Sequence, residues 1–111
     1  GGRRDARRRL LLDGDMKKDV LTRILAVLAA LAQYAAGQPG WVPAPDNYEG
    51  LRYAVPAQKG WFLLRMSLHD PLMPLNIESD CPGGSSAILR ELTPFLTAQP
   101  ALDTTVLEHN G

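Results

Sequence analysis

The chain has a single cysteine, Cys81, among its 111 residues. One cysteine excludes an internal disulfide, and without a CxxC partner it implies neither zinc nor dithiol chemistry. We therefore expect Cys81 to be a bystander thiol in a reducing compartment, and we expect a cytoplasmic protein.

Long apolar runs and an excess of charge of one sign are also missing. The apolar stretch 24–36 contains Gln33 and is shorter than the ~20 residues that a membrane span requires. No secretory signal is visible at the arginine-rich start. Twelve basic and 12 acidic residues give a formal net charge of zero, so no global field recruits a polyanion. We expect no membrane and no nucleic-acid partner.

What the chain does have at its start is a group of arginines: Arg3, Arg4, Arg7, Arg8 and Arg9. Such a group can contact nucleic acid or an acidic partner. No aromatic residue is interleaved with it, however, and the rest of the chain is net acidic. A solvated edge strand or an added tail is the favoured interpretation.

With 45% hydrophobic and 22% charged residues, the chain has the composition of one globular domain with a modest core. Because the chain starts without methionine, we expect a piece of a larger protein or an altered start. We expect a disordered or added tail over 1–6, a folded domain over 7–99 and a frayed tail over 100–111.

The apolar spacing predicts a strand over 7–12, then a turn in which Asp13 or Asp15 caps a helix from Met16 to Gly37. A loop over 37–48 follows, then strands over 51–55, 61–65 and 73–79. Pro74 removes a backbone donor, so we expect an edge or a bulge in the third of these. The last helix follows 82–86. Its inward-facing residues are Ile88, Leu89, Leu92 and Phe95, and Pro94 weakens its final turn. This order predicts an α+β fold, a mostly antiparallel four-stranded sheet with two helices packed on one face.

The segment 65–72, Arg-Met-Ser-Leu-His-Asp-Pro-Leu, joins two of these strands through a short polar loop. Arg65 offers a planar fork of donors that matches phosphate oxygens in pairs. Ser67 adds a hydroxyl, His69 a neutral donor or a cation at lower pH, and a tight turn adds backbone N–H groups. The spacing alone is equally consistent with Arg65 pairing with Asp70 to hold the turn.

Arg52 and the two tryptophans also have predicted roles. Arg52 either faces solvent or helps to position the loop. Trp41 and Trp61 are expected in packing rather than as sugar platforms.

The segment Gly60-Trp-Phe-Leu-Leu-Arg65-x-Ser67-x-x-Asp-Pro71-Leu72 resembles the phosphate-binding loop of the α-D-phosphohexomutases, the phosphoglucomutase and phosphomannomutase family. The last domain of that family carries Arg-Pro-Ser-Gly/Asn-Thr-Glu-Pro-Leu. Segments 47–52 and 75–79 resemble the family's flanking strands, and the resemblance covers 37–97 closely and 16–36 more weakly. Met66, Leu68, His69 and Asp70 depart from the motif, which is typical of a divergent subgroup.

The resemblance implies a fold of the TATA-binding-protein-like group, which is a statement about shape only. It favours Arg65, Ser67 and His69 as ligands of a substrate phosphate. Leu68, Asp70, Pro71 and Arg52 are then supporting residues. Asp70 repels phosphate and is expected to orient Arg65 or to accept backbone N–H groups.

The family's catalytic elements do not occur in this sequence. It has no phosphoserine segment, no Asp-x-Asp-x-Asp magnesium loop and no Gly-Glu-x-Ser loop, which the family carries in three preceding domains. We therefore expect no catalytic residue, metal ligand or cofactor here, and Mg²⁺ and a phosphoserine in the parent. The resemblance implies a closing domain that binds the non-transferred phosphate of a hexose phosphate or bisphosphate, inactive alone and partnered by the preceding domains. A free-standing interaction module or an anion-binding regulatory module are the alternatives.

Overall fold

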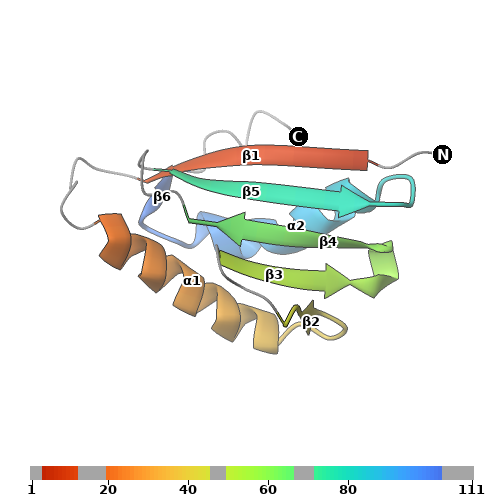
Figure 1. Ribbon diagram of the computed structural model, residues 1–111, viewed down its shortest axis with the longest axis horizontal. Helices are drawn as coiled ribbons and strands as arrows, with labels where there is room; N and C mark the ends of the chain where they lie inside the picture. Colours follow the sequence, from red (N-terminus) through yellow and green to blue (C-terminus); the bar gives the residue numbers. More distant parts are fainter. Residues whose placement is uncertain (1–3, 13–19, 46–49, 67–71, 104–111) are drawn as a thin grey trace.

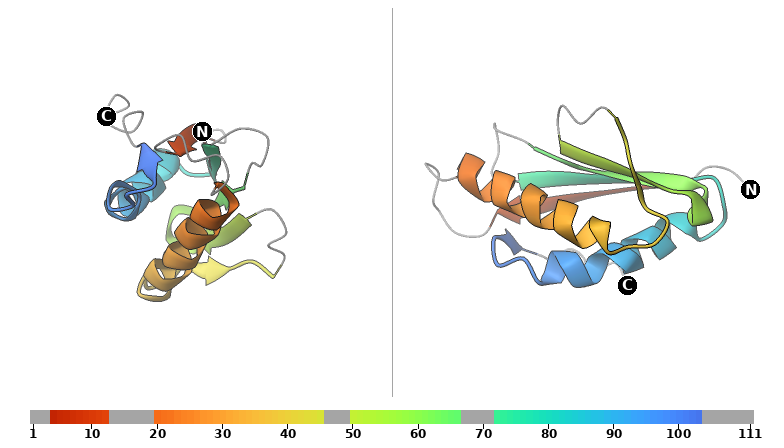
Figure 2. Two further views of the ribbon diagram at one scale, coloured as in Figure 1. Left: turned by 90° about the vertical axis from the view of Figure 1, so that its left-hand side faces the viewer. Right: turned by 90° about the horizontal axis from the view of Figure 1, so that it is seen from below.

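The computed structural model describes residues 4–12, 20–45, 50–66 and 72–103. The elements in chain order are β1 (Arg4–Leu12), α1 (Val20–Ala36), β2 (Val42–Pro43), β3 (Gly50–Val55), the 3₁₀ turn η2 (Pro56–Gln58), β4 (Gly60–Arg65), β5 (Leu72–Ser79), α2 (Gly84–Thr97) and β6 (Leu102–Asp103). The strands form one antiparallel sheet in the order β2-β3-β4-β5-β1-β6 (Figure 1). Both helices lie on the same side of this sheet (Figure 2). The predicted α+β architecture is confirmed, with β3, β4, β5 and β1 as the four long strands.

The two additional strands, β2 and β6, fall in segments that we expected to be a loop and a frayed tail. Each has only two residues and pairs at an edge of the sheet, β2 with β3 and β6 with β1. β1 also starts earlier than predicted, because residues 4–6 of the expected tail pair with β5. Such short pairings are made by backbone groups, and two residues are too few to show an alternating pattern.

The expectation of an edge strand or a bulge at Pro74 was wrong, because β5 lies between β4 and β1 and its register with β1 runs through Pro74 without an extra residue. The ladder between β4 and β5 ends at the pair Leu64–Leu75. The ladder between β5 and β1 continues through the pair Arg9–Pro74. Pro74 thus lies one residue beyond the end of the β4 ladder, so its missing N–H removes no hydrogen bond from that ladder.

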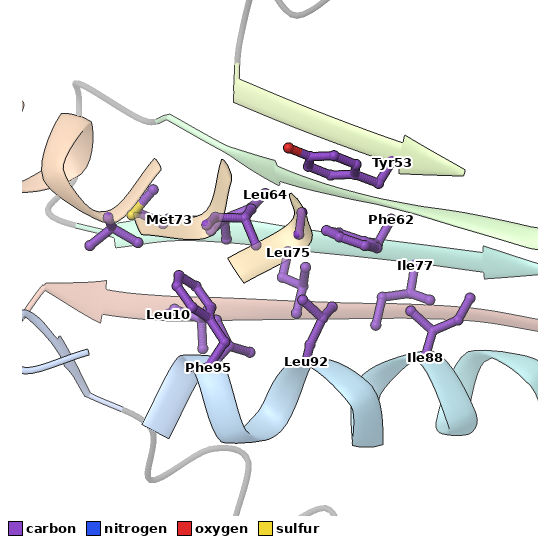
Figure 3. Packing of buried hydrophobic residues seen from close by; sticks show 14 of the residues in the cluster. Leu10, Tyr53, Phe62, Leu64, Met73, Leu75, Ile77, Ile88, Leu92 and Phe95 are labelled. Carbon is purple, nitrogen blue, oxygen red and sulfur yellow. The ribbon is translucent and has the colours of Figure 1, made fainter. Parts of the chain in front are cut away.

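The core lies between the sheet and the two helices, as the alternation of the strands predicts (Figure 3). Met73, Leu75 and Ile77 all point to this side, which confirms their predicted common face. The other buried apolar residues of the cluster are Leu10, Ile24, Val27, Leu31, Ala35, Trp41, Tyr53, Val55, Phe62, Leu64, Ile88, Leu92, Phe95, Leu96 and Leu102. Leu89 packs against this core half-buried, and α2 continues past Pro94 to Thr97.

Trp41 belongs to this core, as expected, and joins α1, α2 and the sheet. Its ring packs edge-on against Phe62 at 4.9 Å and against Tyr34 at 5.9 Å between centroids. Its indole N–H donates to Glu91 Oε1 at 3.2 Å, while the Tyr34 hydroxyl donates to the Glu91 carbonyl oxygen at 2.8 Å. The polar atoms of both large side chains are thus satisfied by one residue of α2.

α1 ends at Ala36, where the Gly37 N–H donates to the Tyr34 carbonyl oxygen at 3.1 Å, and the prediction of an end at Gly37 is confirmed. The predicted first turn and its capping residues, over 13–19, lie outside the described residues. Neither α1 nor α2 has the length and apolar character needed to cross a membrane, and these are the helices of the described part of the chain.

Candidate functional site

The strand–loop–strand unit predicted around the segment 65–72 is confirmed at both ends. β4 ends at Arg65 and β5 begins at Leu72, and the two strands pair as an antiparallel hairpin. Ser67, Leu68, His69, Asp70 and Pro71 lie outside the described residues, so their expected roles stay predictions. Of the predicted site, the structure therefore describes Arg65 and the strands next to the loop end of the β4–β5 hairpin.

Arg65 lies on the face of the sheet that the helices leave uncovered, which we call the outer face. Its neighbour Leu64 points into the core and is 1% exposed, so the alternation of β4 places Arg65 on the opposite side. Arg65 is half-buried, and its Nε atom is buried. The strand alternation therefore fixes the side of the sheet on which the Arg65 side chain lies.

Gly50 lies directly opposite Arg65 in the pairing of β3 with β4. A Cβ atom at position 50 would collide with the Leu64 carbonyl oxygen and would lie 2.8 Å from Arg65 Cα. A glycine is therefore required for β3 to approach the end of β4 this closely.

Arg52, the expected supporting residue, is on the same outer face and is exposed. It pairs with Leu63, one step further from the hairpin end than Gly50. Its guanidinium carbon lies 4.6 Å from the centroid of the Trp61 ring, the geometry of a cation–π contact. Trp61 is half-buried on the outer face and is no member of the buried core, in contrast to Trp41.

Sequence reasoning treated the arginines near the start as one group, and the strand separates two of them. Arg8 pairs with Leu75 on the helix-facing side and is half-buried, whereas Arg9 pairs with Pro74 on the outer face and is exposed. The sequence does not fix this alternation, because residues 10–12 are all leucine; the burial of Leu10 in the structure fixes it. Sequence reasoning missed Arg9 as an outer-face cation near the hairpin end.

The other end of the hairpin carries a small surface depression lined by Lys59, Trp61, Glu78, Ser79 and Asp80. Next to it the Ser79 hydroxyl donates to the Gln58 carbonyl oxygen at 2.5 Å and accepts from the Cys81 N–H at 3.1 Å. The Cys81 thiol also donates to Gln58 O at 3.1 Å. This end joins η2 to the start of α2, and Cys81 has a structural role in it.

Metal coordination finds no support in the described segments. No group of three or more His, Cys, Asp or Glu side chains within them could hold a metal ion.

Comparisons with known proteins bear on the fold. No protein-family model matches the chain, and the search of curated proteins finds no match. Among solved structures, the chain is similar to a phosphoglucomutase/phosphomannomutase family protein from Burkholderia thailandensis, with a TM-score of 0.58 and 18% sequence identity. The match covers 93% of this chain and 19% of that chain.

At this identity the likeness shows a shared fold. It confirms, at the level of fold, the family resemblance drawn from the loop motif. The chain corresponds to about one fifth of the length of the protein it resembles.

Proposed function

We propose that this chain is the C-terminal, phosphate-binding domain of a phosphohexomutase. The observation that carries the proposal is the position of Arg65, at the end of β4 on the outer face, at the start of the loop that resembles the family motif. The motif and the fold likeness support the proposal independently, because the first rests on residues 60–72 and the second on the path of nearly the whole backbone.

In this proposal Arg65 supplies charge-assisted hydrogen bonds to the phosphate that is not transferred. Ser67, His69 and the loop backbone supply further donors, while Asp70 orients the loop. Binding of this kind positions the sugar and so converts a loose encounter into an aligned attack. Closure of the preceding domains around the substrate would complete the site.

The phosphoryl transfer itself belongs to the parent enzyme. It would move a phosphoryl group between the 1- and 6-positions of a hexose phosphate through a bisphosphorylated sugar. Mg²⁺ and a phosphoserine in preceding domains would supply the chemistry. The chain alone should therefore fold and bind hexose phosphate weakly, but show no mutase turnover.

The alternative is a free-standing anion-binding or interaction module that uses its arginine-rich start. Arg9 is exposed and therefore accessible to a partner, which favours this alternative. The reading frame upstream of residue 1 separates the two ideas. A Ser-His and an Asp-x-Asp-x-Asp motif there supports the mutase, and their absence supports the module.

A titration of the ¹⁵N-labelled chain with glucose 6-phosphate tests the binding role directly. We expect amide shifts centred on residues 65–72 that saturate in the millimolar range, because a few hydrogen bonds must also offset the entropy of binding. Glucose without phosphate serves as the control and should leave these amides unchanged. Shifts confined to residues 3–9 would reject the loop as the site and favour the alternative module.

A further inference from the structure

The outer face contains a row of four positions across the sheet at the hairpin end. The pairings give Gly50 opposite Arg65 and Pro74 opposite Arg9, and one further step of the β4–β5 register brings Arg65 opposite Pro74. The row therefore reads Gly50, Arg65, Pro74, Arg9 over β3, β4, β5 and β1. Two arginines alternate with a glycine and a proline, neither of which has a long side chain.

The spacing in this row suits one shared anion. Strands lie about 4.8 Å apart, so the Cα atoms of Arg65 and Arg9 are separated by about 9 to 10 Å. An arginine side chain spans more than half of that distance, so the two guanidinium groups can converge above Pro74. Pro74 is half-buried and compact, and it places no long side chain between them.

The charges on the outer face are unevenly distributed. Arg52 pairs with Leu63, one outer-face position further from the loop than this row, and its guanidinium stacks on Trp61. Glu78, an acidic residue of β5 on the same face, pairs with Trp61 and lies four residues from Pro74, about 13 Å along the strand. The end of the face next to the loop carries Arg65 and Arg9 and, among the described strands, one acidic residue, the half-buried Asp103, which pairs with Leu11 beside the Arg9 row.

We infer that Arg9 is a second phosphate ligand, which shares one phosphate group with Arg65 across Pro74. The inference rests on the proposed function and extends the site from the loop onto the sheet. Two guanidinium forks favour a phosphate dianion over a monoanion, because each supplies charge as well as paired donors. A phosphate monoester has a second pKa near 6, so affinity should rise as the pH increases from about 5 to 7.5.

The test compares the affinity of the full chain for glucose 6-phosphate, measured by NMR titration, in Arg9→Gln, Arg65→Gln and Arg90→Gln. Arg90 is exposed on α2, which lies on the other side of the sheet, so its variant makes the same charge change away from the site. We expect Arg9→Gln to weaken binding about three- to tenfold, since an exposed charged contact contributes less than a buried one. Arg90→Gln should change it less than twofold, and Arg9→Lys should restore part of the loss.

The outcomes separate this inference from the proposed function. If Arg65→Gln weakens binding and Arg9→Gln behaves like Arg90→Gln, Arg9 is not a ligand while the proposed function stands. If neither Arg65→Gln nor Arg9→Gln has an effect, the proposed function fails as well. If only Arg9→Gln weakens binding, β1 binds the phosphate without Arg65, and the inference of a shared site is wrong. A ¹H–¹⁵N spectrum of each variant shows whether the fold is retained.

Discussion

The two faces of the sheet place consecutive residues of the same type in opposite environments. Leu64 is 1% exposed among the core residues under the helices, whereas Leu63 is half-buried on the outer face. Arg8 is on the helix-facing side and Arg9 is exposed on the outer face. Strand alternation thus decides whether a side chain contributes to the stability of the fold or is available to a ligand.

The largest expected effect contrasts Leu64→Ala with Leu63→Ala. Removing the buried side chain should lower the free energy of unfolding by about 2 to 5 kcal/mol, because it leaves a cavity in the core. The half-buried neighbour should lose about 1 kcal/mol or less. Urea unfolding followed by circular dichroism measures both. Equal losses would show that the outer face is covered in solution and would remove the contrast between the faces.

Arg65→Ala should reverse this pattern. We expect the affinity for glucose 6-phosphate to fall about 10- to 100-fold, or about 1.4 to 2.8 kcal/mol, from loss of a charge-assisted contact. The free energy of unfolding should change by about 1 kcal/mol or less, because Arg65 is no core residue. Arg65→Lys should recover only part of the affinity, since the ammonium lacks the bidentate fork. An unfolded Arg65→Ala chain would instead assign Arg65 a structural role.

A smaller effect is expected from the contact between Arg52 and Trp61. Its geometry predicts a coupling of about 0.5 to 1 kcal/mol in a double-mutant cycle of Arg52→Met and Trp61→Leu, measured by urea unfolding. Arg52→Met should also weaken glucose 6-phosphate binding slightly, through the loss of a nearby positive charge. If the stability losses of the two single variants simply add in the double variant, the contact between Arg52 and Trp61 contributes nothing to stability.

The smallest effect at neutral pH belongs to Tyr53 in the core. Burial raises the pKa of its hydroxyl, because the ionised form is poorly solvated there. The unfolded chain ionises near pH 10, below the folded state, so the stabilising contribution is complete below that pH and is lost as the pH rises further. The free energy of unfolding should therefore fall above about pH 10, and less steeply in Tyr53→Phe. Identical pH profiles for the two proteins would contradict this assignment.

Much of the fold could be predicted from the sequence, because the long elements carry clear periods. The alternation of Met73, Leu75 and Ile77 predicted both a strand and its buried face. The two-residue strands β2 and β6 carry no period, since they depend on edge positions that other elements create. Pro74 was assigned to an edge or a bulge because a proline shows only that a donor is missing, not where the neighbouring ladder ends.

The candidate site was predictable in part, for a similar reason. The composition of the segment 65–72 indicated an anion-binding loop, and the structure confirms the strands that hold its ends. Arg9 is separated from Arg65 by 56 positions, and their common row depends on the order of the strands in the sheet. A local motif cannot report that order, so the second arginine emerged only from the sheet register.

The most direct test of the account follows the Arg65 side chain itself. In a ¹H–¹⁵N spectrum that records arginine Nε–Hε groups, glucose 6-phosphate should shift the Arg65 signal in a saturable way, with the same midpoint as the amides of 65–72. Arg65→Ala should remove this signal and raise the midpoint for the remaining amides about tenfold or more. An Arg65 signal that stays unchanged at saturating glucose 6-phosphate, in a folded chain, would contradict the claim that Arg65 binds the phosphate.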